Sequence, residues 1–149
     1  MDATTCFDDV FAALARERIA HVVVGGQALV LQGIERDTRD LDLVVDRTPA
    51  EAARAMAAFA ALGFFPTVPL PLALVPVLRL LDRAGRELDV FAQFQVPFAE
   101  LLAGSVEVDV RGAVVRVASV ADVIRAKRLC GRPRDVEDAE RLERTLRKS

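Results

Sequence analysis

The chain has 149 residues, 52% of them hydrophobic and 28% charged, which is enough to bury one hydrophobic core and predicts a single domain over 1–149. A formal net charge of −2 argues against broad, non-specific binding of nucleic acid, and a single histidine, His21, excludes a multi-histidine metal site. The 22 acidic side chains favour carboxylate chemistry with hard cations such as Mg²⁺ instead.

Hydrophobic periodicity predicts alternating helices and strands in the first part of the chain. Apolar residues at helical spacing predict a helix over 7–18, and the β-branched run 19–24 predicts a buried strand that ends in a glycine pair. We expect a short helix over 27–31 and a second strand over 41–45. A threonine, a proline and an early glutamate are typical of a helix start, and they predict a helix over 48–62.

The second part of the chain predicts hairpins followed by helices. Two apolar segments around a polar turn predict a β-hairpin over 77–94, a short helix is expected over 97–102, and a second tight hairpin over 106–117. Two helices are expected at the C-terminal end, over 120–130 and 135–147. This order predicts an α/β (α+β) fold with a small mixed sheet, flanking helices and two C-terminal helices.

Several features predict a cytoplasmic protein. Cys6 and Cys130 are isolated thiols that we expect to be reduced, and residues 1–9 lack the pattern of a secretory signal. The apolar stretch 64–81 is too short and too rich in proline to span a bilayer. The mean hydropathy of +0.27 and the apolar segment 66–76 predict a surface that meets a second copy or a small co-encoded partner protein.

The glycine pair Gly25–Gly26 stands directly between a predicted strand and a predicted helix. Two glycines at such a turn let the backbone pass close to a ligand, and the free N–H groups at the helix start favour an anion such as phosphate. The alternative is an ordinary turn.

Asp40 and Asp42 flank a leucine at the start of the second strand. Residues two apart in a strand point to the same face, so the two carboxylates stand side by side and repel each other. A divalent cation would relieve this repulsion. The alternative is that Asp40 ends the preceding loop and Asp42 is solvated.

Asp89 is a lone carboxylate inside the apolar strand of the first hairpin. Buried carboxylates are rare unless they are paired, hydrogen-bonded or bound to a metal. The alternative is an aspartate at the sheet edge that faces water.

Taken in order, these three features resemble the DNA polymerase beta-type nucleotidyltransferase superfamily. Its signature is a hydrophobic residue and a Gly-Gly or Gly-Ser pair before a short helix, then an Asp-x-Asp strand and a third acid further on. The stretch 36–44 (RDTRDLDLV) is similar to the version in small, minimal nucleotidyltransferases, many of which belong to toxin–antitoxin or phage-defence systems. The segment 119–142 looks like the C-terminal helical segment of the same proteins.

The resemblance implies an enzyme that moves an NMP from an NTP to a hydroxyl acceptor by a two-metal carboxylate mechanism. Asp40, Asp42 and Asp89 would be the catalytic residues and would hold one or two Mg²⁺ ions. Asp89 would also help to take the proton from the acceptor hydroxyl. The acceptor stays open between a protein, a small molecule and an RNA end.

The resemblance also implies a set of nucleotide-binding residues. Gly25 and Gly26 would cradle the triphosphate through their backbone N–H groups, and Lys127, one of two lysines beside 18 arginines, would neutralise its charge. Arg39 is a further candidate, together with Arg36, and solvated loop arginines are the alternative for both. The family often has serine where Gly26 stands, so a hydroxyl group for phosphate is missing there.

Three other polar residues have ordinary interpretations. Asp135 and Asp138 are expected to complement the dipole of the last helix, although matching acids approach the active site in this family. His21 begins an apolar strand, which predicts a structural role.

Two alternatives from other functional classes stay open. A catalytically silent binding module, similar to an antitoxin, would keep the fold and use the apolar segment 66–76 as its interface. A transcriptional regulator that uses the last two helices is less favoured, because the break at 132–134 is not a typical helix-turn-helix turn.

Overall fold

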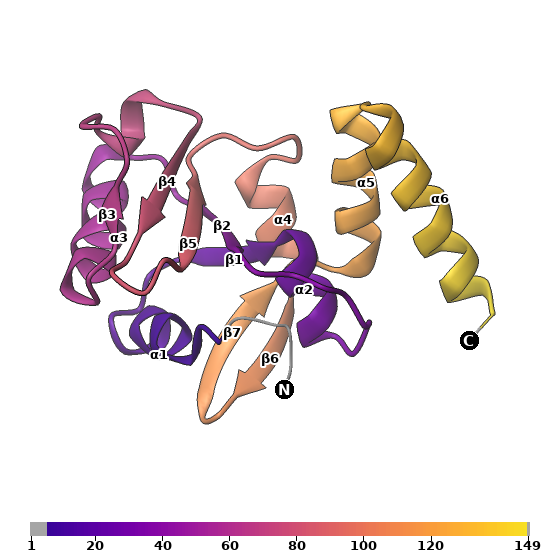
Figure 1. Cartoon of the computed structure of the whole chain (residues 1–149), viewed down its shortest axis with the longest axis horizontal. Coiled ribbons are helices and arrows are strands. Elements are labelled where there is room, and N and C mark those ends of the chain that lie inside the picture. The colour runs from indigo at the N-terminus through magenta and orange to yellow at the C-terminus, as the bar shows by residue number, and fades with distance from the viewer. Residues whose placement is uncertain (1–5, 149) are drawn as a thin grey trace.

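The structure is a computed structural model and describes residues 6–148 (Figure 1). Its centre is a seven-stranded mixed sheet in this described part, with the order β3-β4-β5-β2-β1-β7-β6. The strands are β1 (His21–Val24), β2 (Leu41–Val45), β3 (Phe65–Pro66), β4 (Val77–Leu81), β5 (Glu87–Phe91), β6 (Val106–Val110) and β7 (Ala113–Val117). The β2–β5 and β1–β7 pairs are parallel and the other neighbours are antiparallel. The predicted α/β class and both hairpins are confirmed.

Helices flank this sheet, and the last two of them lie together at one end of the molecule. They are α1 (Asp8–Arg16), α2 (Gly25–Leu31), α3 (Pro49–Ala61), α4 (Phe98–Gly104), α5 (Val120–Cys130) and α6 (Pro133–Arg147). Figure 1 shows α5 and α6 side by side at the end opposite α3, with α2 between α5 and the central strands. The two expected C-terminal helices are therefore confirmed.

The central strand β1 is buried on both faces, whereas β4 and β5 bury only one face in the hydrophobic core. In β4 and β5 the buried positions alternate with partly exposed ones, so Leu78, Leu80, Leu88 and Val90 point into the core. They join one cluster with buried residues of α1 and α3, such as Phe59. Burying each of these leucines contributes about 2 kcal/mol to stability. The alternate residues of the same strands face the other side of the sheet, which leaves that side open to polar chemistry.

Three predicted boundaries differ from the structure. Strand β1 begins at His21 rather than at residue 19, helix α2 already begins at Gly25, and helix α6 begins at Pro133. Proline is favoured in the first turn of a helix because its missing N–H has no helical partner there. The Ser119 side chain caps α5 by accepting a hydrogen bond of 3.1 Å from the Asp122 N–H.

The proline-rich segment 65–76 forms β3 and a short 3₁₀ turn, η1 (Leu72–Leu74), neither of which the sequence predicted. Several of its apolar side chains are exposed, with Phe65 at 60% and Leu74 at 78%. Exposed apolar side chains in one segment fit the predicted partner surface, which stays a prediction.

Two further expectations concern the cysteines and the membrane. Cys6 and Cys130 are both free thiols, as expected. Cys6 is exposed and Cys130 is partly buried. Within residues 6–148, no helix combines the length and the apolar character that crossing a membrane requires.

Candidate active site

One row across four strands of the sheet joins polar residues of three strands to the glycine turn that follows the fourth. Val24 of β1 is the register partner of Asp42 of β2, Asp42 is the partner of Asp89 of β5, and Asp89 is the partner of Arg79 of β4. Val24 is followed directly by Gly25, the first residue of α2. The row therefore places the glycine pair, two aspartates and an arginine in line on the sheet.

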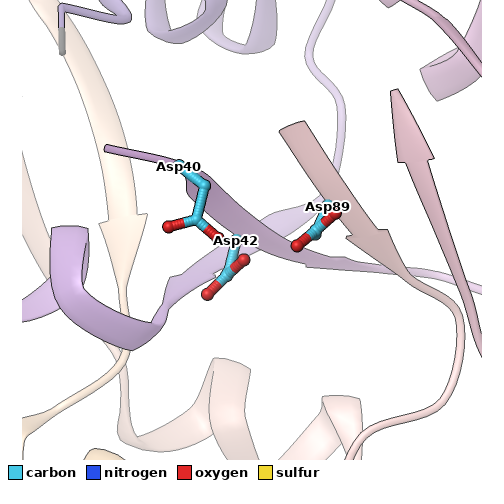
Figure 2. A group of neighbouring side chains, drawn as sticks. All are labelled: Asp40, Asp42 and Asp89. Atoms are coloured by element: carbon cyan, nitrogen blue, oxygen red, sulfur yellow. The ribbon is translucent and has the colours of Figure 1, made fainter. Parts of the chain in front are cut away.

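The three predicted carboxylates converge on one point. Asp40 precedes β2 and lies two residues before Asp42, and Figure 2 shows both side chains on the same side of the strand, with Asp89 approaching from β5. Asp40, Asp42 and Asp89 each offer one carboxylate oxygen, and these oxygens lie within 4.8 Å of one another. Strand β5 lies between β4 and β2, so Asp89 is not at the sheet edge. The site geometry that the sequence predicted is thus present.

The electrostatics of this cluster favour a bound cation. Burial, followed by the nearby charges of Asp40 and Asp89, raises the pKa of Asp42 to about 7, against the opposing effect of Arg79. Three carboxylate oxygens within reach of one ion are the hard ligands that Mg²⁺ prefers. The residues therefore fit a divalent cation, which would relieve the repulsion that raises the pKa of Asp42.

Arg79 is a site residue that sequence reasoning missed. Its guanidinium donates hydrogen bonds of 2.9 and 3.0 Å to the two oxygens of the Asp89 carboxylate, and it lies 3.5 Å from Glu87. The Asp89 side chain is only 13% exposed. The residue could have been found by counting back through the predicted hairpin turn, because antiparallel pairing places Arg79 opposite Asp89.

The two glycines lie where an added Cβ atom would force a neighbouring side chain to move. Gly25 has φ +68°, and a Cβ atom there would lie 2.5 Å from Asp42 Oδ2. A Cβ atom at Gly26 would lie 2.8 Å from Thr38 Oγ1 and 3.0 Å from Thr38 Cβ. The buried Thr38 side chain thus fills the space that a side chain at position 26 would enter.

Lys127 lines the same cavity as Gly25. This cavity has a volume of about 130 Å³ and lies between the end of β1 and helix α5. Its walls combine apolar side chains such as Phe94 and Leu101 with polar ones such as Asp122. The structure therefore brings the predicted lysine to the predicted glycine turn.

Arg36 and Asp138 differ from their predicted roles. Arg36 donates two hydrogen bonds to Asp138, so it is not a solvated loop arginine. Asp138 lies beyond the first turn of α6, because that helix begins at Pro133, and it binds side chains rather than the helix dipole. Asp135 does lie in the first turn and pairs with Arg132 at 2.6 Å.

Arg39 and His21 differ in their surroundings. Arg39 is exposed on the loop before Asp40, and its nucleotide-binding role stays a prediction. His21 is buried, donates from Nδ1 to the Ile19 carbonyl at 2.7 Å and accepts at Nε2 from the Arg116 N–H at 3.1 Å. Burial lowers the pKa of His21 and keeps the ring neutral, as a structural role requires.

Solved structures with the same arrangement of elements identify the fold. A Thermotoga maritima protein assigned as a nucleotidyltransferase is 20% identical, with a TM-score of 0.64 over 95% of this chain and 90% of that one. The chain has the nucleotidyltransferase fold. The lincosamide antibiotic adenylyltransferase LnuA, with lincomycin bound, is 14% identical with a TM-score of 0.61, over 91% of this chain and 92% of that one.

A third nucleotidyltransferase-fold structure is the antibiotic-resistance factor ANT(2'')-Ia. It is 19% identical, with a TM-score of 0.62 over 92% of this chain and 80% of that one. No family model and no curated protein matches the sequence. The expected type of fold is confirmed, whereas the toxin–antitoxin or defence role stays a prediction.

Proposed function

We propose that this protein is a Mg²⁺-dependent nucleotidyltransferase that moves an NMP from an NTP to a hydroxyl acceptor. The observation that carries the proposal is the convergence of Asp40, Asp42 and Asp89 beside the glycine turn at Gly25. The nucleotidyltransferase fold supports it, because solved proteins of similar fold include the adenylyltransferase LnuA and a protein in complex with an adenylylated antibiotic.

Each site residue has a role in this reaction. Asp40, Asp42 and Asp89 hold the cation, which when bound neutralises phosphate charge and polarises the α-phosphate. The backbone N–H groups of Gly25 and its neighbour face the triphosphate, and Lys127 binds its charge from the wall of the shared cavity.

The register row suggests where the acceptor enters. The α2 turn and Arg79 lie at opposite ends of the row, with Asp42 and Asp89 between them. When the triphosphate lies at the glycine turn, the space beside Asp89 is available to the acceptor. The oxygen of the acceptor hydroxyl then bonds to the α-phosphorus while pyrophosphate leaves, and Asp89 accepts the hydroxyl proton.

A small molecule is the acceptor class that we favour. Two of the solved structures of similar fold contain such compounds: LnuA has lincomycin bound, and ANT(2'')-Ia is in complex with adenylyl-2''-tobramycin. Both proteins are under 25% identical to this chain, so the particular acceptor has to be found by screening hydroxyl compounds for pyrophosphate release.

Calorimetry with ATP, GTP, CTP and UTP in the presence of Mg²⁺ tests the proposal. We expect at least one NTP to bind only with the metal, and Asp42→Asn to abolish this binding while the fold is kept. The matched control is Asp109→Asn on strand β6, a strand that lies at the far sheet edge and should leave binding unchanged. The proposal fails when none of the four NTPs binds in a metal-dependent way, or when Asp42→Asn binds as the wild type does.

The same experiment separates an enzyme from a catalytically silent module. An enzyme releases pyrophosphate when it is given the bound NTP and an acceptor. Metal-dependent binding that never leads to pyrophosphate release across protein, small-molecule and RNA acceptors would support the silent module instead.

A further inference from the structure

Asp138 joins two cations from distant parts of the chain. Its Oδ2 atom accepts from Lys127 Nζ of α5 at 3.0 Å and from Arg36 Nη2 at 2.5 Å, and its Oδ1 atom accepts from Arg36 Nη1 at 3.1 Å. The three side chains are 17%, 20% and 26% exposed for Asp138, Lys127 and Arg36. Charged groups that are so far removed from water are held in defined positions by their hydrogen bonds.

This ion cluster connects the C-terminal helices to the loop that carries the first carboxylate. Arg36 belongs to the loop 32–40, which ends at Asp40, and Asp138 belongs to α6, the outermost helix in Figure 1. A second contact joins the same loop to the start of α5, because Gln32 Nε2 donates to the Ala118 carbonyl at 2.8 Å. Two side-chain contacts therefore hold the C-terminal helices against the loop that ends at Asp40. Arg36 binds Asp138 of α6, and Gln32 binds the backbone just before α5.

Lys127 is the part of this cluster that faces the site. It lines the cavity shared with Gly25, whereas Arg36 and Asp138 do not line it. A lysine ammonium has three N–H donors, and the bond to Asp138 occupies one of them. Among residues 6–148 this is the one ion pair that Lys127 makes, which leaves two donors for phosphate oxygens on a side chain that would otherwise sample many rotamers.

We propose that Asp138 is a positioning residue that holds the Lys127 ammonium at the triphosphate site. This inference rests on the proposed function, since it assigns Lys127 to the phosphates. Asp138 does not touch the nucleotide. It acts through Lys127, and its bonds to Arg36 keep the carboxylate in place on the loop side.

Amine labelling tests the Asp138–Lys127 contact without any activity. The chain has only two lysines, so an acylating reagent followed by peptide mass spectrometry reports on Lys127, with the exposed Lys148 as internal reference. The ion pair of 3.0 Å with Asp138 holds the Lys127 ammonium in one position, where the partly buried side chain is shielded from the reagent. In Asp138→Asn we expect Lys127 to react at least threefold faster and Lys148 at an unchanged rate.

The matched control for this variant is Glu143→Gln. Glu143 also joins α6 to α5, through a hydrogen bond of 2.5 Å from Arg128, but it does not contact Lys127. A general loosening of the helix pair would raise labelling of Lys127 in both variants, and this result would overturn the proposal.

A double-mutant cycle on nucleotide affinity tests the positioning role itself. The probe is the Mg²⁺ complex of whichever of the four NTPs binds the wild type. We expect Lys127→Met to weaken binding at least tenfold and Asp138→Asn to weaken it about three- to tenfold. The double variant should bind as weakly as Lys127→Met alone, because Asp138 acts only through the lysine. A structural role of Asp138 would instead make the two losses additive.

The outcomes separate this inference from the proposed function. Wild-type protein that binds none of the four NTPs overturns the proposed function, and the phosphate role of Lys127 with it. Wild-type binding that persists at full strength in Asp138→Asn overturns the positioning role alone. Should Asp138→Asn fail to fold, Arg36→Gln takes its place, because it removes the two hydrogen bonds that hold the Asp138 carboxylate on the loop side. It should speed the labelling of Lys127 and leave Lys148 unchanged, and equal labelling of Lys127 in this variant and the wild type would overturn the positioning role.

Discussion

Arg79 donates two hydrogen bonds to the Asp89 carboxylate from the position directly opposite it on the neighbouring antiparallel strand. The guanidinium therefore supplies positive charge to the carboxylate cluster at its β4 side. A cation bound by Asp40, Asp42 and Asp89 would share the Asp89 oxygens with this arginine. The pair consequently links the stability of the metal-free protein to its affinity for metal.

Replacing this arginine should separate the two effects. In Arg79→Gln, the metal-free protein is expected to lose about 1 kcal/mol of stability, because the guanidinium is half exposed and its charge is partly screened. Its affinity for Mg²⁺ should rise about three- to tenfold, because a competing cation is gone. Thermal melts across a Mg²⁺ titration measure both quantities.

Arg116→Gln is the control for this prediction. Arg116 pairs across the β6–β7 hairpin with Glu107 at 2.7 Å, in the same cross-strand geometry. Its loss should leave the Mg²⁺ affinity unchanged. Equal responses of the two variants to Mg²⁺ would show that Arg79 has no special relation to the metal site.

The raised pKa of Asp42 predicts a pH dependence of the metal-free protein. The folded-state pKa of about 7 lies above the ordinary value of 3.8, so between these values the folded state binds more protons than the unfolded state. The Asp42 contribution to stability is therefore present at low pH and is lost as the pH rises through 7. Chemical denaturation from pH 5 to 8 should show this loss in the wild type relative to Asp42→Asn, which shares every other titrating group.

Metal binding should respond to pH in the opposite direction. Mg²⁺ binds the ionised carboxylate and so releases the Asp42 proton below pH 7. We expect the Mg²⁺ affinity to fall by up to about tenfold for each pH unit below 7. Calorimetry in buffers of different ionisation enthalpy counts the proton released, and a count of zero at pH 6 would contradict the assignment.

Replacing Gly25 with alanine, the smallest possible substitution, should weaken metal binding. In Gly25→Ala, the new methyl group would lie 2.5 Å from Asp42 Oδ2 on a backbone with φ +68°. We expect a cost of about 1 kcal/mol or more from the backbone alone, and a large decrease in Mg²⁺ affinity because the carboxylate must move. Gly33→Ala is the control, since Gly33 has φ +87° but its added Cβ would meet nothing within 4 Å. It should lower stability and leave Mg²⁺ binding intact.

Gly26 and Thr38 should behave as a coupled pair. Gly26→Ser is expected to destabilise the protein by about 1–3 kcal/mol, because its Cβ atom would lie 2.8 Å from Thr38 Oγ1. Adding Thr38→Ala removes that oxygen, so the double variant should be more stable than the sum of the two single changes predicts, by at least about 0.5 kcal/mol. Equilibrium unfolding of the four proteins measures this coupling, and strict additivity would contradict the packing described above.

Much of the local structure could be predicted because it depends on near neighbours in the chain. The strand at Leu41–Val45 and both hairpins follow from alternation and turn residues, and the Ser119 cap follows from its own helix. The start of α2 was missed because Gly25 was assigned to a turn. Glycine is a poor helix former, and Gly25 has the positive φ of +68° that is typical of a turn residue.

The candidate site also contains residues that could be predicted from the sequence and residues that could not. Asp40 and Asp42 share a face through the two-residue period of a strand, which any strand imposes. Arg36 and Asp138 could not be assigned from sequence, because their bond joins residues 102 positions apart and each looks like an ordinary surface charge in its own segment.

The sequence by itself determined the type of chemistry. A glycine pair at a strand end and three aspartates in strands specify backbone N–H donors and hard oxygen ligands, whatever their later arrangement. Only the tertiary structure decided which charges oppose and support those ligands. Parallel pairing of β2 with β5 sets Asp42 beside Asp89, antiparallel pairing of β4 sets Arg79 against the same carboxylate, and the packing of α6 turns Asp138 toward Lys127. Strand order and helix packing depend on the burial of the whole core, and no single segment of the sequence carries that information.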